Sequence, residues 1–155
     1  MSALVSLRIL TKALTERLAF VSPLLARIVT GVVFTHSGWG KLHNLDPVTQ
    51  FFASLGIPHP ELQAPFVASI ELGCGALVLA GLATRLAAIP LVGTMAVALA
   101  TALASEITDA NALFGLSEFL YIALLVQLVL GGAGAISIDR FVGAFLDAKP
   151  APARA

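Results

Sequence analysis

The sequence places a histidine, a tryptophan and a lysine within eight residues, Thr35–Leu42, at the end of an apolar run. A single glutamate, Glu71, interrupts the next apolar run. Ionisable groups in a lipid-spanning segment are costly and usually face a protein interior or a water-filled cavity. A carboxylate in such a place either has a partner or takes up a proton. The pattern therefore indicates an intramembrane polar site that includes His36, Lys41 and Glu71.

The composition places the chain in the membrane class. Of its 155 residues 58% are hydrophobic and only 12% charged, and its mean hydropathy is +0.95. An ordinary globular domain carries about a quarter charged residues, so the expected partner of this surface is the lipid bilayer. Nine basic and nine acidic residues cancel, and no nucleic-acid partner is expected. The one cysteine, Cys74, can form neither an internal disulfide nor a CxxC redox pair.

Four apolar runs predict an all-α fold, an integral membrane four-helix bundle made by residues 24–134. Amphipathic helices are expected at the membrane interface on both sides of it, within residues 1–23 and 135–155. The N-terminal segment is not expected to be a cleaved signal, because its charges continue through Arg17 and no small-residue cleavage site follows. The four predicted spans cover residues 24–42, 65–84, 86–105 and 116–132.

The lysines and arginines predict the orientation of these spans. With four spans, eight of the nine basic residues fall on one side of the membrane and only Lys41 falls on the other. By the positive-inside rule both termini are cytoplasmic, in a multi-pass protein of the cell's inner (plasma) membrane. The loops at residues 44–64 and 106–115 then face outside.

The predicted outer half of the membrane holds the candidate catalytic residues. His36 and Glu71 each lie roughly 9 Å from the outer ends of their helices, at 1.5 Å per residue. We therefore expect these two residues to pair. The alternative interpretation is a buried ion pair that only fixes the register of the helices. The candidate catalytic residues are His36, Lys41, Glu71 and Glu118.

A second charged group falls near the predicted inner interface, where arginines at helix ends are ordinary anchors. We expect it to be structural, with Asp139 paired to Arg85 or to Arg27 so that helix ends are held together. Its members are Arg27, Arg85, Asp139 and Arg140. No metal site is expected, because two of the three histidines, His43 and His59, lie outside any predicted helix.

Short motifs occur in a fixed order around the predicted spans. They are Arg27 with Gly31, His36–Leu42, Leu55–Pro58, Glu71–Gly75, Gly81–Arg85 and Gly132–Arg140. In order and spacing they resemble the DoxX family. The resemblance implies a four-helix membrane protein associated with thiosulfate:quinone oxidoreduction, with oxidoreductase complexes that answer oxidative or thiol stress, or with metal handling. The positions that carry over from the family pattern are Arg27, Lys41, Glu71, Arg85, Glu118 and Asp139, whereas His36 and Cys74 are particular to this chain.

Three functions remain open at this stage, and whether the protein is an enzyme is left open with them. In the first, a redox-associated membrane subunit contacts a quinone whose headgroup exchanges protons with His36 and Glu71. The sequence holds no haem, flavin or iron–sulfur motif, so electrons would come from a partner oxidoreductase subunit. The second is a non-enzymatic membrane scaffold or assembly subunit. The third, ranked below them, is a small transporter, which would require a homo-oligomer because four spans without an inverted repeat are few.

Overall fold

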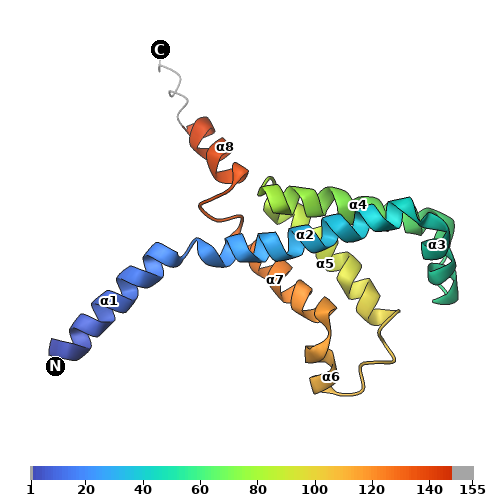
Figure 1. The fold of residues 1–155 in the computed structure, drawn as a ribbon, viewed down its shortest axis with the longest axis horizontal. Helices are drawn as coiled ribbons and strands as arrows, with labels where there is room; N and C mark the ends of the chain where they lie inside the picture. Colours follow the sequence, from blue (N-terminus) through green and yellow to red (C-terminus); the bar gives the residue numbers. More distant parts are fainter. Residues whose placement is uncertain (1, 148–155) are drawn as a thin grey trace, which may run out of the picture.

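The computed structural model describes residues 2–147, and all regular structure in this part of the chain is helical (Figure 1). The prediction of an all-α fold is confirmed. In chain order the helices are α1 (Ser2–Leu18), α2 (Val21–His43), α3 (Leu45–Ser54), α4 (Pro60–Ala80), α5 (Thr84–Ala100), α6 (Ala110–Gly115), α7 (Ser117–Gly131) and α8 (Ile138–Asp147).

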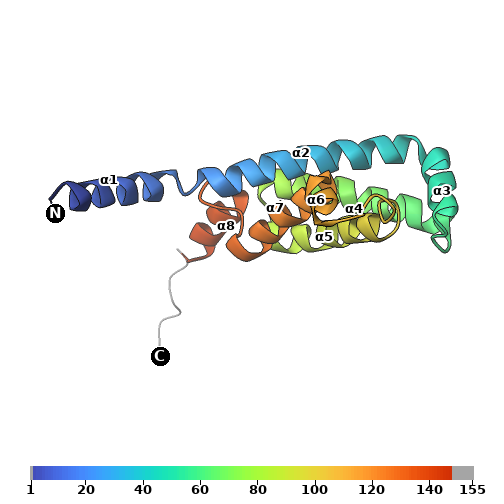
Figure 2. The same ribbon diagram turned by 90° about the horizontal axis from the view of Figure 1, so that it is seen from below.

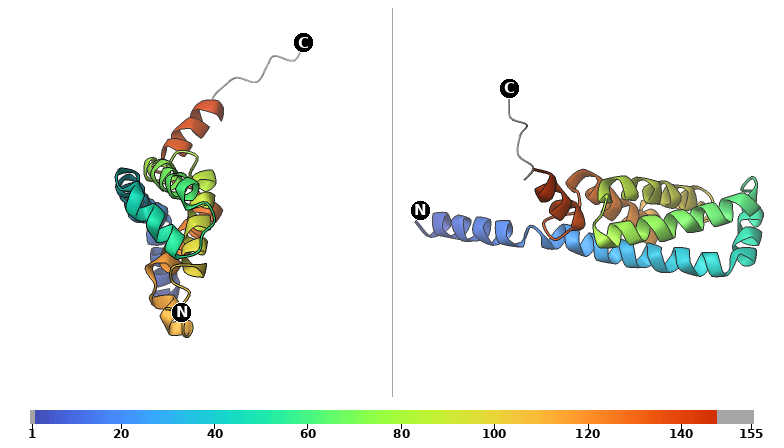
Figure 3. Two further views of the ribbon diagram at one scale, coloured as in Figure 1. Left: turned by 90° about the vertical axis from the view of Figure 1, so that its right-hand side faces the viewer. Right: turned by 90° about the horizontal axis from the view of Figure 1, so that it is seen from above.

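Helices α2, α4, α5 and α7 pack into a bundle (Figures 1 and 2). Helix α2 runs antiparallel to α4 and α5 antiparallel to α7, while α3 closes the far end of the α2–α4 pair (Figure 3). All four helices contribute to one buried core, which includes Phe34, Val78, Leu91, Leu125 and Leu128. The short connection between α4 and α5 and the end of α7 meet at the other end of the bundle, beside the start of α2 (Figure 1).

Many large apolar side chains lie on the outside of this bundle rather than in its core. Phe66, Leu86 and Leu130, from three different helices, are 61%, 72% and 74% exposed. A soluble protein rarely exposes apolar surface on this scale. Two helical stretches, Leu4–His43 and Pro60–Ala80, are long and apolar enough to cross a membrane. The exterior therefore suits contact with lipid.

The other two bundle helices are shorter. Helix α5 has 17 residues and α7 has 15, whereas a perpendicular crossing takes about 20. Four spans and cytoplasmic termini therefore stay predictions. Helix α4 begins at Pro60, ahead of the predicted second span, since proline is well suited to the first turn of a helix. It ends at Ala80 because Gly81 takes the left-handed conformation, with φ of 72°.

Helices α1 and α8 lie outside the bundle, within the predicted terminal segments 1–23 and 135–155. Helix α1 extends away from the bundle, and α8 follows the loop after α7 (Figures 1 and 2). Pro23 lies in the first turn of α2, where a proline is tolerated. Phe141 and Phe145 of α8 are 74% and 76% exposed, so α8 carries an unpacked apolar face. The position of both helices at a membrane interface stays a prediction, and residues 148–155 lie outside the described part.

Glycines bring the backbones of α2 and α4 into direct contact. A Cβ atom on Gly38 would lie 2.3 Å from the backbone nitrogen of Leu72, and one on Gly75 would lie 2.7 Å from that of Thr35. Side chains larger than hydrogen would therefore push the two helices apart. Close approach through small residues is a common way for membrane helices to associate. It also brings short polar side chains of α2 within reach of α4.

Candidate functional site

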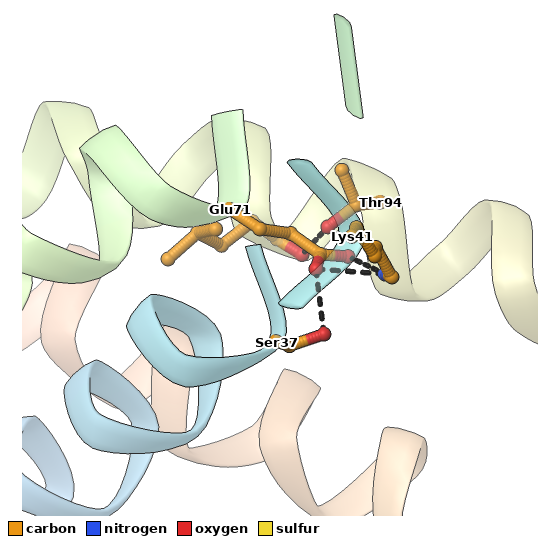
Figure 4. A network of polar contacts seen from close by, with 5 residues as sticks. Ser37, Lys41, Glu71 and Thr94 are labelled. Atoms are coloured by element: carbon orange, nitrogen blue, oxygen red, sulfur yellow. Dashed lines mark hydrogen bonds and ion pairs between the residues drawn. The ribbon is translucent and has the colours of Figure 1, made fainter. Parts of the chain in front are cut away.

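The outer polar cluster is centred on the carboxylate of Glu71 in α4 (Figure 4). Lys41, in the last turns of α2, donates from Nζ to both carboxylate oxygens, at 2.6 and 2.7 Å. Ser37 donates from its hydroxyl to Oε2 at 2.8 Å. Thr94 of α5 lies beside this group in Figure 4, and its hydroxyl donates to the backbone oxygen of Leu91 at 2.9 Å. The cluster therefore joins α2 to α4 next to a polar side chain of α5.

Burial differs sharply across this ion pair. Glu71 is 1% exposed, while 30% of the Lys41 side chain is exposed. A buried carboxylate must be compensated by charge and hydrogen bonds, and here an ammonium group and a hydroxyl provide both. The part-exposed Lys41 therefore connects the buried carboxylate oxygens of Glu71 to the outside of the bundle. The arrangement can hold a negative charge out of solvent, and it can exchange a proton with a group that reaches Lys41.

The structure does not form the expected pair of His36 with Glu71. Ser37 and Lys41 are four residues apart on α2 and therefore share the face that packs on α4. His36 is turned by roughly 100° from Ser37, because an α-helix has 3.6 residues per turn. Its side chain is exposed on the outside of the bundle. His36 thus remains a candidate only for contact with something outside the chain.

Glu118 lies in the first turn of α7, away from the Glu71 carboxylate. Its carboxylate accepts a hydrogen bond from the hydroxyl of the neighbouring Ser117, at 3.1 Å from Oε2. The structure therefore brings together two of the four candidate residues, Lys41 and Glu71. Ser37 was missed by the sequence analysis, although its spacing of four from Lys41 and its place next to Gly38 could have indicated it.

The inner group is organised around Arg27 of α2, which is only 4% exposed. Its guanidinium donates to the backbone oxygens of Val78 and Leu79 at 3.0 and 2.9 Å. It also donates to the oxygens of Ala133, at 3.1 Å, and Ile136, in the loop after α7. The last carbonyls of a helix have no intrahelical partner. Arg27 therefore satisfies the end of α4 and ties it to the α7–α8 loop.

Asp139 binds the N-terminal end of a helix, whereas Arg27 binds a C-terminal end. Its carboxylate accepts from the backbone N–H groups of Ala83, at 2.6 Å, and Thr84, at 3.0 Å, where α5 begins. Such an anion at a helix N-terminus satisfies free donors and complements the helix dipole. The expected ion pair of Asp139 with Arg85 or Arg27 is wrong, because none forms within residues 2–147. The donors at the start of α5 occupy the carboxylate instead.

Replacing Asp139 by alanine is expected to destabilise the protein by about 0.5–2 kcal/mol, the cost of losing a helix cap. The measurement is the thermal unfolding temperature of the full chain in mild detergent. Asp109→Ala is the matched control, because Asp109 caps the short α6 through the N–H of Ala112 and bonds no other helix among the described residues. It is expected to change the unfolding temperature less.

The same experiment separates a cap from an ion pair. Because Asp139 bonds backbone N–H groups, adding Arg85→Gln to Asp139→Ala should recover none of the lost stability. A clear recovery in the double variant would contradict the cap and restore the ion pair.

Comparison with known proteins gives two relatives and one family. The DoxX family profile matches residues 22–104. The Bacillus subtilis (strain 168) protein named "Putative oxidoreductase CatD" is 35% identical over 124 residues, which cover 79% of this chain and 87% of that protein. The Escherichia coli (strain K12) "Inner membrane protein YqjF" is 29% identical over 133 residues, 82% of this chain and 96% of that one. No solved structure matches the chain.

Proposed function

The chain belongs to the DoxX family, and on this premise we propose that it is an inner-membrane, redox-associated subunit that contacts a quinone. One observation carries the proposal. The carboxylate of Glu71 is 1% exposed and ionically bonded inside an apolar helix bundle, and intramembrane ionisable residues usually serve function. The names of the two relatives, "Putative oxidoreductase CatD" and "Inner membrane protein YqjF", support the class and the location.

The cluster suits proton exchange with a quinone headgroup. Two-electron reduction of a quinone adds one proton to each of its two carbonyl oxygens. Lys41 and Ser37 are hydrogen-bond donors held by Glu71, and the part-exposed Lys41 side chain can meet a headgroup that enters from the lipid. Protons that Lys41 gives up return from the aqueous side. The electrons would come from a partner oxidoreductase subunit, since the sequence carries no redox motif of its own.

A scaffold function is the second candidate, and a specific observation favours it. Both oxygens of Glu71 already accept hydrogen bonds from within the chain, and the glycine contacts hold α2 against α4. On this interpretation the ion pair only fixes the register of the two helices, which is the best-attested use of buried polar groups. Such a protein would hold a partner subunit in the membrane without binding a quinone.

Trp39 provides a direct test, because it is the only tryptophan in the chain and lies on α2 within one turn of Lys41. A short-chain ubiquinone analogue that binds at the cluster should quench Trp39 fluorescence saturably. Glu71→Gln keeps the shape but removes the charge that holds Lys41, so it should weaken this binding by roughly tenfold, the loss of one charge-assisted contact. It should also fail to complement a deletion strain.

The matched control is Glu61→Gln, which changes an exposed carboxylate in the first turn of the same helix. It should bind the analogue as the wild type does. The unfolding temperature of each variant in detergent checks that the fold is intact. Wild-type quenching and full complementation by Glu71→Gln would overturn the quinone proposal and leave the scaffold function in front.

A further inference from the structure

A hollow of about 530 Å³ lies at the opposite end of the bundle from Lys41. Residues of the turn between α4 and α5, of the loop after α7 and of the start of α8 form its walls. Its lining includes two arginines, Arg85 in the first turn of α5 and Arg140 in the first turn of α8. The rest of the lining is largely the glycine-rich backbone of residues 131–135.

Arg85 and Arg140 bring two positive charges to this hollow, against the single negative charge of Asp139. Neither Arg85 nor Arg140 makes an ion pair or a side-chain hydrogen bond within residues 4–145, the part whose side chains the structure describes. Asp139 also lines the hollow, but its carboxylate accepts from the N–H groups of Ala83 and Thr84. The two guanidinium groups are therefore available to an anion, and guanidinium binds phosphate oxygens through two parallel hydrogen bonds.

The backbone of the loop after α7 also favours an anion in the hollow. Gly132 has φ of 80°, and a Cβ atom there would lie 3.1 Å from Nε of Arg85. The glycine thus lets the arginine lie close against the loop. Residues 133–135 line the hollow, and their backbone N–H groups donate no hydrogen bond in the described part of the chain. Successive free N–H groups of this kind favour anions.

Apolar surface borders the hollow. Leu86, which lines it, is 72% exposed, and Phe141 of the adjoining helix α8 is 74% exposed. Cationic groups next to apolar surface are found where lipid headgroups meet acyl chains. The arginines of the hollow also belong to the side that the lysine and arginine distribution predicts to be cytoplasmic.

We propose that this hollow binds the phosphate group of an anionic phospholipid at the inner membrane surface. Arg85 and Arg140 hold the phosphate oxygens, the loop after α7 lies beneath them, and the acyl chains run over Leu86. The site is separate from the Lys41–Glu71 cluster and does not depend on its function. Lipid at this position would link α5 to α8 through its headgroup.

Native mass spectrometry of the full chain in mild detergent tests the proposal. Phosphatidylglycerol is expected to bind at least roughly tenfold more tightly than zwitterionic phosphatidylcholine, since each arginine near an anionic lipid adds severalfold. Arg85→Gln with Arg140→Gln should abolish this preference. The matched control is Arg8→Gln with Arg17→Gln, which removes two exposed arginines from α1 and should leave the preference within about twofold, because no hollow is involved.

Two further comparisons test whether the bound phosphate belongs to a lipid and whether the lipid preference arises in the hollow. Inorganic phosphate at millimolar concentration should not displace phosphatidylglycerol, and displacement would overturn the assignment to a lipid. An equal loss of preference in the α1 control would overturn the hollow as the site and indicate general charge attraction. The Arg85→Lys, Arg140→Lys variant keeps both charges without the planar fork, and it should show an intermediate preference.

Discussion

Replacing Arg27 by methionine is expected to lower the stability of the protein by about 3–5 kcal/mol, since hydrogen bonds to a charged donor contribute about 1.5–3 kcal/mol each without adding fully. Arg27 is 4% exposed. Its guanidinium donates to four backbone oxygens, two at the end of α4 and two in the loop after α7. Methionine fills similar volume but donates to none of them, so buried carbonyls lose their partner.

Thermal unfolding in mild detergent measures this effect. Arg27→Lys keeps the charge but has no planar fork, so it should lie between the wild type and Arg27→Met. Arg85→Met is the matched control, because Arg85 is an exposed arginine at the same end of the bundle. An unfolding temperature for Arg27→Met equal to that of Arg85→Met would show that the four hydrogen bonds do not stabilise the fold.

Lys41→Met is also expected to lower the stability of the protein by about 3–5 kcal/mol, because it leaves the buried carboxylate of Glu71 without its cation. Glu71 is 1% exposed, and after this change only Ser37 would still donate to it. Replacing both members of a buried pair by apolar residues is often neutral or stabilising. Lys41→Met with Glu71→Leu should therefore recover most of the lost stability.

A double-mutant cycle on these two residues gives their interaction free energy from unfolding in detergent. The matched control is a cycle on Lys12 and Glu16, an exposed pair 3.9 Å apart on α1, which should give a coupling of about 0–1 kcal/mol. Additive effects of Lys41→Met and Glu71→Leu would contradict the pair. The cycle measures stability alone, so its result does not decide between quinone contact and a scaffold.

The sequence by itself determined the class of the protein and drew attention to charged residues such as Arg27 and Glu71. Its apolar runs and sparse charge predict an all-helical chain for a lipid environment, because helix periodicity and lipid solvation depend on local composition. A lone carboxylate such as Glu71 stands out in an apolar run for the same reason. The grouping of Arg27 with Asp139 near one end of the helices also follows from chain length and helix rise.

Only the tertiary structure decided which partner each charge has. Periodicity shows that Ser37 and Lys41 share a face of α2 and that His36 does not, but it does not show which face meets α4. Contacts spread over the whole α2–α4 interface, including the backbone approach at Gly38, select the face with Lys41. Likewise, Asp139 meets N–H groups rather than an arginine because the α4–α5 turn presents free donors there. Donors of this kind arise where a helix begins in space, and residue type does not reveal them.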